Sequence, residues 1–239
     1  MPPSPESIVI DIETAIDKQL ISDVIFEDQN MDPEEAYIEY RRQLKEKNGS
    51  DFISVFFHYP ITIGYAHVGL NYRIKKVGTL PRGDEGVYKL WEAINKGFRL
   101  ITWNGRSFDM PVMEQAAFRL GIPAKDYYNS KYGARYRYSE DGHYDLYDFV
   151  TNSGVVYFRG GLNAMSKMIG LPGKVGSVRG SEVQQAYEDG RHDEIDAYCV
   201  GDVLITVGMY LHVEYIRGRL TKDEYDERMD DVKGRIAAL

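Results

Sequence analysis

The chain has 239 residues, of which 43% are hydrophobic and 28% are charged. A chain of this length and composition can bury a full hydrophobic core, so we do not expect disorder to be its main state. The formal net charge of −8 excludes a broad basic surface, so any nucleic-acid contact must use local cations, aromatic rings and metal ions. The single cysteine, Cys199, excludes an internal disulfide and a cysteine-rich zinc site.

Targeting signals are not expected in this sequence. The first residues, Met-Pro-Pro-Ser-Pro-Glu, have neither the basic start nor the apolar stretch of a signal peptide. We also expect no apolar run long enough to span a bilayer. One cysteine fits a reducing compartment. The sequence therefore predicts a cytoplasmic protein that does not contact a membrane.

The first predicted element is a buried strand at 7–14, which reads Ser-Ile-Val-Ile-Asp-Ile-Glu-Thr. Asp11 and Glu13 interrupt its β-branched run, and side chains two apart on a strand share one face. Two neighbouring carboxylates repel each other and are costly to desolvate, whereas a hard cation such as Mg²⁺ or Mn²⁺ stabilises them. The alternative is that the strand ends early and both acids lie in a solvated loop.

An acidic insertion follows at about 17–51. Within it a helix is predicted at 33–47, with Asp32 as the N-cap and Pro33 in the first helical position. Its apolar face is narrow. We therefore expect this segment to lie over the core as a flap and to be mobile in part.

The remaining elements follow from alternation and from helical spacing of apolar residues. We expect strands at 61–68, 71–77 and 98–103, a strand or strand-turn at 143–150, and helices at 84–95, 111–120, 162–169, 181–188 and 193–219. There are no internal repeats and no low-complexity linker. The sequence thus predicts one α/β domain over 1–239, with the order β-β-β-α-β-α-β followed by helices.

Asn104 to Asp109, read as Asn-Gly-Arg-Ser-Phe-Asp, joins the strand at 98–103 to the next helix. Taken alone, Asn104-Gly105 is an ordinary turn pair and Asp109 an ordinary N-cap. Near 143–150, we expect Asp145 and Asp148 to cap or to form ion pairs. His143 is expected to be structural.

The last long helix carries Tyr198 and Asp202, which lie four residues apart and so share one helix face. The neighbouring face is apolar. An acid beside such a face needs a partner or a metal ion.

These three segments resemble, in order and spacing, the motifs of 3′–5′ exonucleases of the DEDD superfamily, in the Tyr-containing (DEDDy) subgroup. The closest likeness is to predicted stand-alone exonucleases related to the proofreading exonuclease domain of family B DNA polymerases. In the subgroup with a catalytic histidine, that residue lies five before the last acid, where this chain has Ala197. The likeness spans nearly the whole chain and implies a ribonuclease H-like fold, a central mixed sheet flanked by helices.

The resemblance also implies a two-metal hydrolysis of phosphodiester bonds, with two Mg²⁺ or Mn²⁺ ions about 3.5–4 Å apart. The residues expected to hold the ions are Asp11, Glu13, Asp109 and Asp202, and Asp11 is expected to bind both ions. Tyr198 is expected to orient the attacking water. Its ordinary pKa, near 10, makes it a poor free base.

Four further residues are candidate substrate contacts. Asn104 is expected to hold the strand near the scissile phosphate, and Phe108 to wedge against the terminal bases. Arg106 and Lys174 are candidate phosphate contacts, and for Lys174 the alternative is a solvated loop residue. The expected partners are single-stranded DNA 3′ ends and a polymerase or another replication or repair protein.

Two alternatives stay open at this point. The same scaffold can act on RNA, since the motifs do not read the 2′-hydroxyl. The chain can also be a nucleic-acid-binding subunit that has lost catalysis, although a pure binder has no need for a repulsive carboxylate cluster.

Overall fold

The structure, a computed structural model, describes residues 6–131, 133–158, 160–173 and 178–239. One mixed sheet has the strand order β3-β2-β1-β4-β5. Central β1 is antiparallel to β2 and parallel to β4, and β5 is parallel to β4. The strands are β1 Ser7–Ile16, β2 His58–Val68, β3 Ile74–Thr79, β4 Arg99–Thr102 and β5 His143–Asp145.

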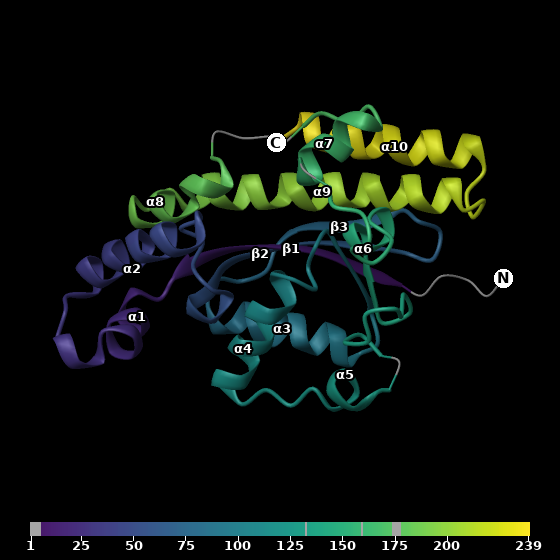
Figure 1. Cartoon of the computed structure of the whole chain (residues 1–239). Helices are drawn as coiled ribbons and strands as arrows, with labels where there is room; N and C mark the ends of the chain where they lie inside the picture. The colour runs from purple at the N-terminus through teal and green to yellow at the C-terminus, as the bar shows by residue number, and fades with distance from the viewer. Residues whose placement is uncertain (1–5, 132, 159, 174–177) are drawn as a thin grey trace.

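Helices cover both faces of this sheet. Figure 1 shows α9 along one face, with α7 and α10 on the side of α9 away from the sheet, and α3 and α4 on the other face, with α5 beyond α3. This arrangement confirms the predicted α/β fold with a central mixed sheet. The helices are α1 Lys18–Ile25, α2 Pro33–Asn48, α3 Asp84–Asn95, α4 Asp109–Leu120, α5 Lys125–Asn129, α6 Leu146–Val150, α7 Gly161–Met168, α8 Val183–Glu188, α9 His192–Ile216 and α10 Lys222–Ala237.

The alternation along β1 decides which way its acids face. Val9 belongs to the hydrophobic cluster beneath α9 and α10. The residues on the opposite face of β1, which pack against α3 and α4, are Ile8, Ile10 and Ile12. Asp11 and Glu13 lie two and four residues after Val9 and therefore point to the same face of the sheet, which is the α9 side.

Helix α9 is the core helix of the protein. Among the described residues it alone is long and apolar enough to cross a membrane, by length and composition, but 78% of its most apolar window is buried inside the protein. The expectation that no run reaches this length is therefore wrong. Its apolar character serves the core, because the sheet lies on one side of it and α10 on the other.

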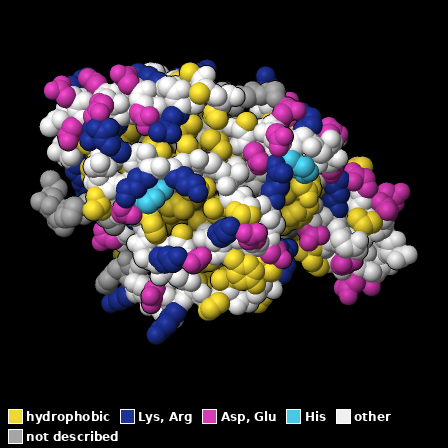
Figure 2. All heavy atoms as spheres, turned by 180° about the vertical axis from the view of Figure 1, so that it is seen from behind, with side chains coloured by type: hydrophobic (Ala, Val, Ile, Leu, Met, Phe, Trp, Pro, Cys, Tyr) yellow, Lys and Arg dark blue, Asp and Glu magenta, His cyan; other side chains and the backbone are white. Residues whose placement is uncertain are grey.

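The insertion at 17–51 is more regular than predicted. The expected helix is α2, and the Asp32 carboxylate accepts hydrogen bonds from the Glu34 and Glu35 amides at its start. A second helix, α1, packs against it, and the two share a small cluster of their own. The buried members of that cluster are Ile21, Phe26, Ala36, Ile53 and Phe57. The insertion projects beyond the sheet in Figure 1, and acidic side chains gather on it in Figure 2.

Several predicted elements differ from the observed ones for local reasons. Strand β3 begins at Ile74 because the chain turns first, with Tyr72 in the left-handed region at φ 61°. Strand β5 stops at Asp145, whose carboxylate caps α6 by accepting from the Tyr147 amide at 3.0 Å. Helix α10 was not predicted, although Thr221 and Glu224 form a capping box at its start.

Candidate active site

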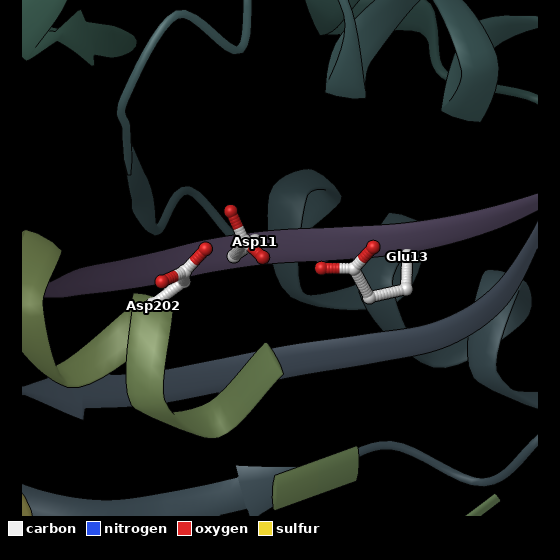
Figure 3. A group of neighbouring side chains, drawn as sticks. All are labelled: Asp11, Glu13 and Asp202. Carbon is white, nitrogen blue, oxygen red and sulfur yellow. The ribbon is translucent and has the colours of Figure 1, made fainter. Parts of the chain in front are cut away.

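Three carboxylates from two elements meet on the α9 side of the sheet. Asp11 and Glu13 come from β1 and Asp202 from α9, as Figure 3 shows. Each offers an oxygen, and these oxygens all lie within 4.8 Å of one another. Strand β1 continues to Ile16, so the alternative of a solvated loop is wrong. The approach of α9 to β1 thus brings together the acids of the first and third motifs.

Gly64 allows α9 to lie this close to the sheet. It pairs with Asp11 across β1 and β2. A Cβ atom at this position would lie 2.8 Å from the Cys199 sulfur and 3.0 Å from Cγ2 of Val203. The Cys199 thiol in turn donates to the Asp11 carbonyl at 3.2 Å. Neither Gly64 nor the Cys199 contact is predictable from the sequence, because both depend on which strand α9 crosses.

Asp109 joins this site from the opposite side. It is the first residue of α4 and makes no side-chain cap there, so its interpretation as an N-cap is wrong. Its carboxylate instead accepts from the Ile12 amide at 3.1 Å, since the pairing of β1 with β4 ends at Val9. Burial, followed by the nearby carboxylates of Asp145 and Asp202, raises the pKa of Asp109 to about 7, against the effect of its backbone donors.

This raised pKa predicts a pH dependence of the metal-free protein. Between about pH 4 and pH 7 the folded state keeps the Asp109 proton that the unfolded state has lost, so this contribution to stability disappears as the pH rises through the folded pKa. We expect the free energy of unfolding to fall more steeply with pH in the wild type than in Asp109→Asn. Urea unfolding in the presence of chelator, from pH 4 to 8, measures the free energy of unfolding of both proteins. Parallel plots of this free energy against pH would contradict the prediction.

Tyr198 lies one helical turn before Asp202 and lines the same cleft. Its side chain is 2% exposed and packs in a cluster with Ile195 and Val183. The loop before α8 approaches its hydroxyl, since a Cβ at Gly180 would lie 3.6 Å from that oxygen. The ring is therefore fixed by packing on the same helix that supplies Asp202.

The turn after β4 is fixed by Asp145, which the sequence predicted as a cap. The Asp145 carboxylate accepts from the amides of Asn104 at 2.8 Å and Arg106 at 2.9 Å, in addition to that of Tyr147. Asn104 adopts a left-handed conformation with φ 61° and lines the cleft. Its role as a substrate contact stays a prediction.

Arg106 does not line this cleft, and its interpretation as a phosphate contact is wrong. Its guanidinium donates to the carbonyls of Ala134, Ser139 and His143 at 2.6–3.1 Å. Asp148 lies 3.6 Å from its Nε. The charge of Arg106 therefore stabilises the segment before β5 and is turned away from the site.

Two candidates remain, His143 and Lys174. His143 is buried, and burial lowers its pKa well below the ordinary value. Its Nε2 lies 2.7 Å from the Thr102 hydroxyl, as expected of a structural histidine. Lys174 lies outside the described residues.

Three aromatic rings form the rim of the cleft on the side of Phe108. The ring centres of Phe108 and His58 are 5.4 Å apart, and exposed Phe52 lies 6.3 Å from Phe108. Burial lowers the pKa of His58, and its Nε2 faces the Ile53 carbonyl at 3.2 Å. The neutral ring must donate there, so Nδ1 accepts from the Thr14 hydroxyl at 2.8 Å. Phe52, which directly follows the insertion at 17–51, was not predicted from the sequence as a residue of the site.

Seven of the predicted site residues border one cleft of about 750 Å³, namely Asp11, Glu13, Asn104, Phe108, Asp109, Tyr198 and Asp202. The other residues that line it are Ile12, Thr14, Ile16, Tyr37, Arg41, Asp51, Phe52, Ile53, His58, Trp103, Tyr147, Tyr157, Phe158, Gly161, Gly180, Ser181, Val183 and Gln184. The cleft therefore combines a partly buried acidic floor with an aromatic rim.

Comparisons with known proteins bear on the fold and the family of this chain. No curated protein matches the chain. The family B DNA polymerase from the hyperthermophilic archaeon Pyrobaculum calidifontis has a similar fold, with a TM-score of 0.54 and 14% identity over 90% of this chain. The match covers 25% of the polymerase chain. A family model for a predicted 3′–5′ exonuclease related to the exonuclease domain of PolB matches residues 50–238, so this chain belongs to that family.

Proposed function

We propose that this chain is a metal-dependent 3′–5′ exonuclease of the Tyr-containing type, which shortens single-stranded DNA from its 3′ end. The observation that carries the proposal is the convergence of Asp11, Glu13 and Asp202 within 4.8 Å, in a cleft that also holds Asp109 and Tyr198. The family match supports an exonuclease.

The donor set fits divalent cations. Its ligands are carboxylate oxygens, which Mg²⁺ and Mn²⁺ prefer, and three such groups this close repel one another without a cation. We assign Asp11, Glu13 and Asp202 to one ion and Asp109, with Asp11, to a second. The ions would stabilise negative charge on the attacked phosphodiester and on the leaving oxygen.

Tyr198 would orient the attacking water through its hydroxyl. Tyr198→Phe keeps the buried ring and removes only that oxygen, so we expect the fold to remain and kcat to fall about 10- to 100-fold with little change in KM. Steady-state kinetics with circular dichroism as a folding control measure this. A variant with wild-type kcat would show that the hydroxyl has no role.

Phe108, Phe52 and His58 would support the terminal bases by stacking. Base stacking on an aromatic ring is worth about 1–3 kcal/mol, so Phe108→Ala should raise KM about fivefold or more and leave kcat nearly unchanged. The matched control is Phe118→Ala, which removes a ring that is 90% exposed and lies outside this cleft. Equal KM values for the two variants would contradict the stacking role.

The wider setting is also proposed. The net charge of −8 suits binding of a strand end better than binding of a duplex. The enzyme would act in the cytoplasm beside a polymerase or another replication or repair protein.

A labelled strand tests the function. A short single strand with a 5′ label, offered as DNA and as RNA, is incubated with Mg²⁺, with Mn²⁺ and with chelator. We expect a ladder of shortened labelled products that requires metal and is stronger on DNA. A stronger ladder on RNA would indicate an exoribonuclease. Full-length strand under every metal would favour a binding subunit without catalysis.

A further inference from the structure

We propose that Arg41, supplied by the insertion at 17–51, binds a phosphate of the incoming strand, and that Asp51 holds its guanidinium until the strand enters. The inference rests on the proposed function, because it takes a nucleic-acid strand as the ligand. Arg41 lies before residue 50, where the family match begins, so the contact would be a feature of this chain.

The charges of the residues that line the cleft favour a cationic side chain as a contact for the phosphates of a strand. Among the described residues, Arg41 is the one lysine or arginine that lines the cleft. Two divalent ions would cancel four of the five carboxylate charges, and Arg41 would cancel the fifth. A strand adds one negative charge with each phosphate, so phosphates beyond the metal site need a cation. The five carboxylates are Asp11, Glu13, Asp51, Asp109 and Asp202.

The geometry positions Arg41 for such a contact. Its Nη2 donates to the Asp51 carboxylate, and its Nη1 donates to the Tyr37 hydroxyl at 3.3 Å. Its guanidinium carbon lies 5.4 Å from the centre of the Tyr37 ring. The side chains of Arg41 and Asp51 are 45% and 44% exposed, and an ion pair this open to water is weak. A phosphate, which accepts two parallel N–H donors, can replace the Asp51 carboxylate while Tyr37 still supports the guanidinium.

The helix that carries Arg41 is anchored to the other wall of the cleft. Lys18 forms ion pairs with Glu34 on α2 and, at 2.6 Å, with Glu188 on α8. Its ammonium also lies 4.8 Å from the centre of the Tyr37 ring. Together with the buried cluster that α1 and α2 share, these contacts hold the backbone of α2, so the strand would have to order only the side chain of Arg41.

Binding of a labelled strand to the full chain tests the contact. The probe is a fluorescent single strand of DNA, with Ca²⁺ in place of Mg²⁺, and anisotropy gives Kd at several salt concentrations. Arg41→Gln should weaken binding about 3- to 10-fold at low salt and lower the slope of log K against log salt by about 0.7. Arg42→Gln, which removes a neighbouring guanidinium paired with Glu39 and Glu46, should change neither. Equal effects of the two variants would overturn the proposal.

Asp51 provides a test of opposite sign. If it competes with the phosphate for Arg41, Asp51→Asn should tighten binding about 2- to 5-fold, whereas Glu46→Gln should not. In the Arg41→Gln background, Asp51→Asn should give no further tightening, because it acts through Arg41. Weaker binding in Asp51→Asn, or tightening that persists without Arg41, would overturn its holding role.

These results are separable from the proposed function. A wild-type protein that binds the strand without shortening it would contradict the exonuclease and leave the role of Arg41 intact, provided that Arg41→Gln weakens binding. If the protein shortens the strand and Arg41→Gln does not change binding, the exonuclease is supported and the role of Arg41 is contradicted. Thermal unfolding of each variant confirms that the insertion remains folded.

Discussion

Asp202→Ala is expected to lower the rate of strand shortening by about 1,000-fold or more while the protein stays folded, and Asp11→Ala to do the same. A bound cation contributes several kcal/mol of charge stabilisation to phosphodiester hydrolysis, and each 1.4 kcal/mol is a factor of ten in rate. Removing a carboxylate also relieves repulsion in the cluster. The free energy of unfolding without metal should therefore hold or rise.

The control for these variants is Asp226→Ala, which removes an exposed carboxylate paired with Lys222 on α10. It should leave both rate and stability nearly unchanged. Loss of the thermal transition together with activity in Asp202→Ala would mean that the carboxylate supports the fold, and would refute the metal assignment.

Gly64→Ala is expected to disturb both stability and activity. The new Cβ would lie 2.8 Å from the Cys199 sulfur, so α9 must move away from the sheet or the thiol must shift. Overpacking of this kind costs about 1–3 kcal/mol of folding free energy. Because Asp202 moves with α9, a displacement near 1 Å should also cost about 100-fold in kcat. Urea unfolding and steady-state kinetics measure the two effects.

Two comparisons isolate this effect. Adding Cys199→Ala removes the closest contact and should restore part of the lost stability and rate. Gly234→Ala, inside α10 with no atom within 4 Å of the new Cβ, should instead stabilise the protein by about 0.5–1 kcal/mol. Wild-type activity in Gly64→Ala would show that the close approach of α9 to β2 at Gly64 does not determine the position of Asp202.

The parts of the site that depend on local geometry were predictable from the sequence. The period of two along a strand places Asp11 and Glu13 on one face, and the helical period places Tyr198 beside Asp202. The sheet and most helices followed from the same two periods. Helix α1 was missed because it is short and forms its apolar cluster with α2, and α10 because its charged surface hides a narrow buried face.

The parts that depend on contacts between distant segments were not predictable. The bond from the Ile12 amide to Asp109 joins residues 97 apart, and the approach of Cys199 to Gly64 depends on the crossing of α9 over β2. Arg106 failed as a substrate contact for the same reason. The sequence shows a cation near a motif, whereas the fold supplies the three carbonyls that bind it.

Anomalous diffraction from crystals grown with Mn²⁺ tests whether Asp11, Glu13 and Asp202 form a site for divalent cations. We expect a manganese peak bounded by the carboxylates of these three residues and a second ion beside Asp11 and Asp109. Crystals of Asp202→Ala should lose the first peak. Wild-type crystals that hold no manganese among these carboxylates, at millimolar Mn²⁺, would show that the three residues do not form a metal site.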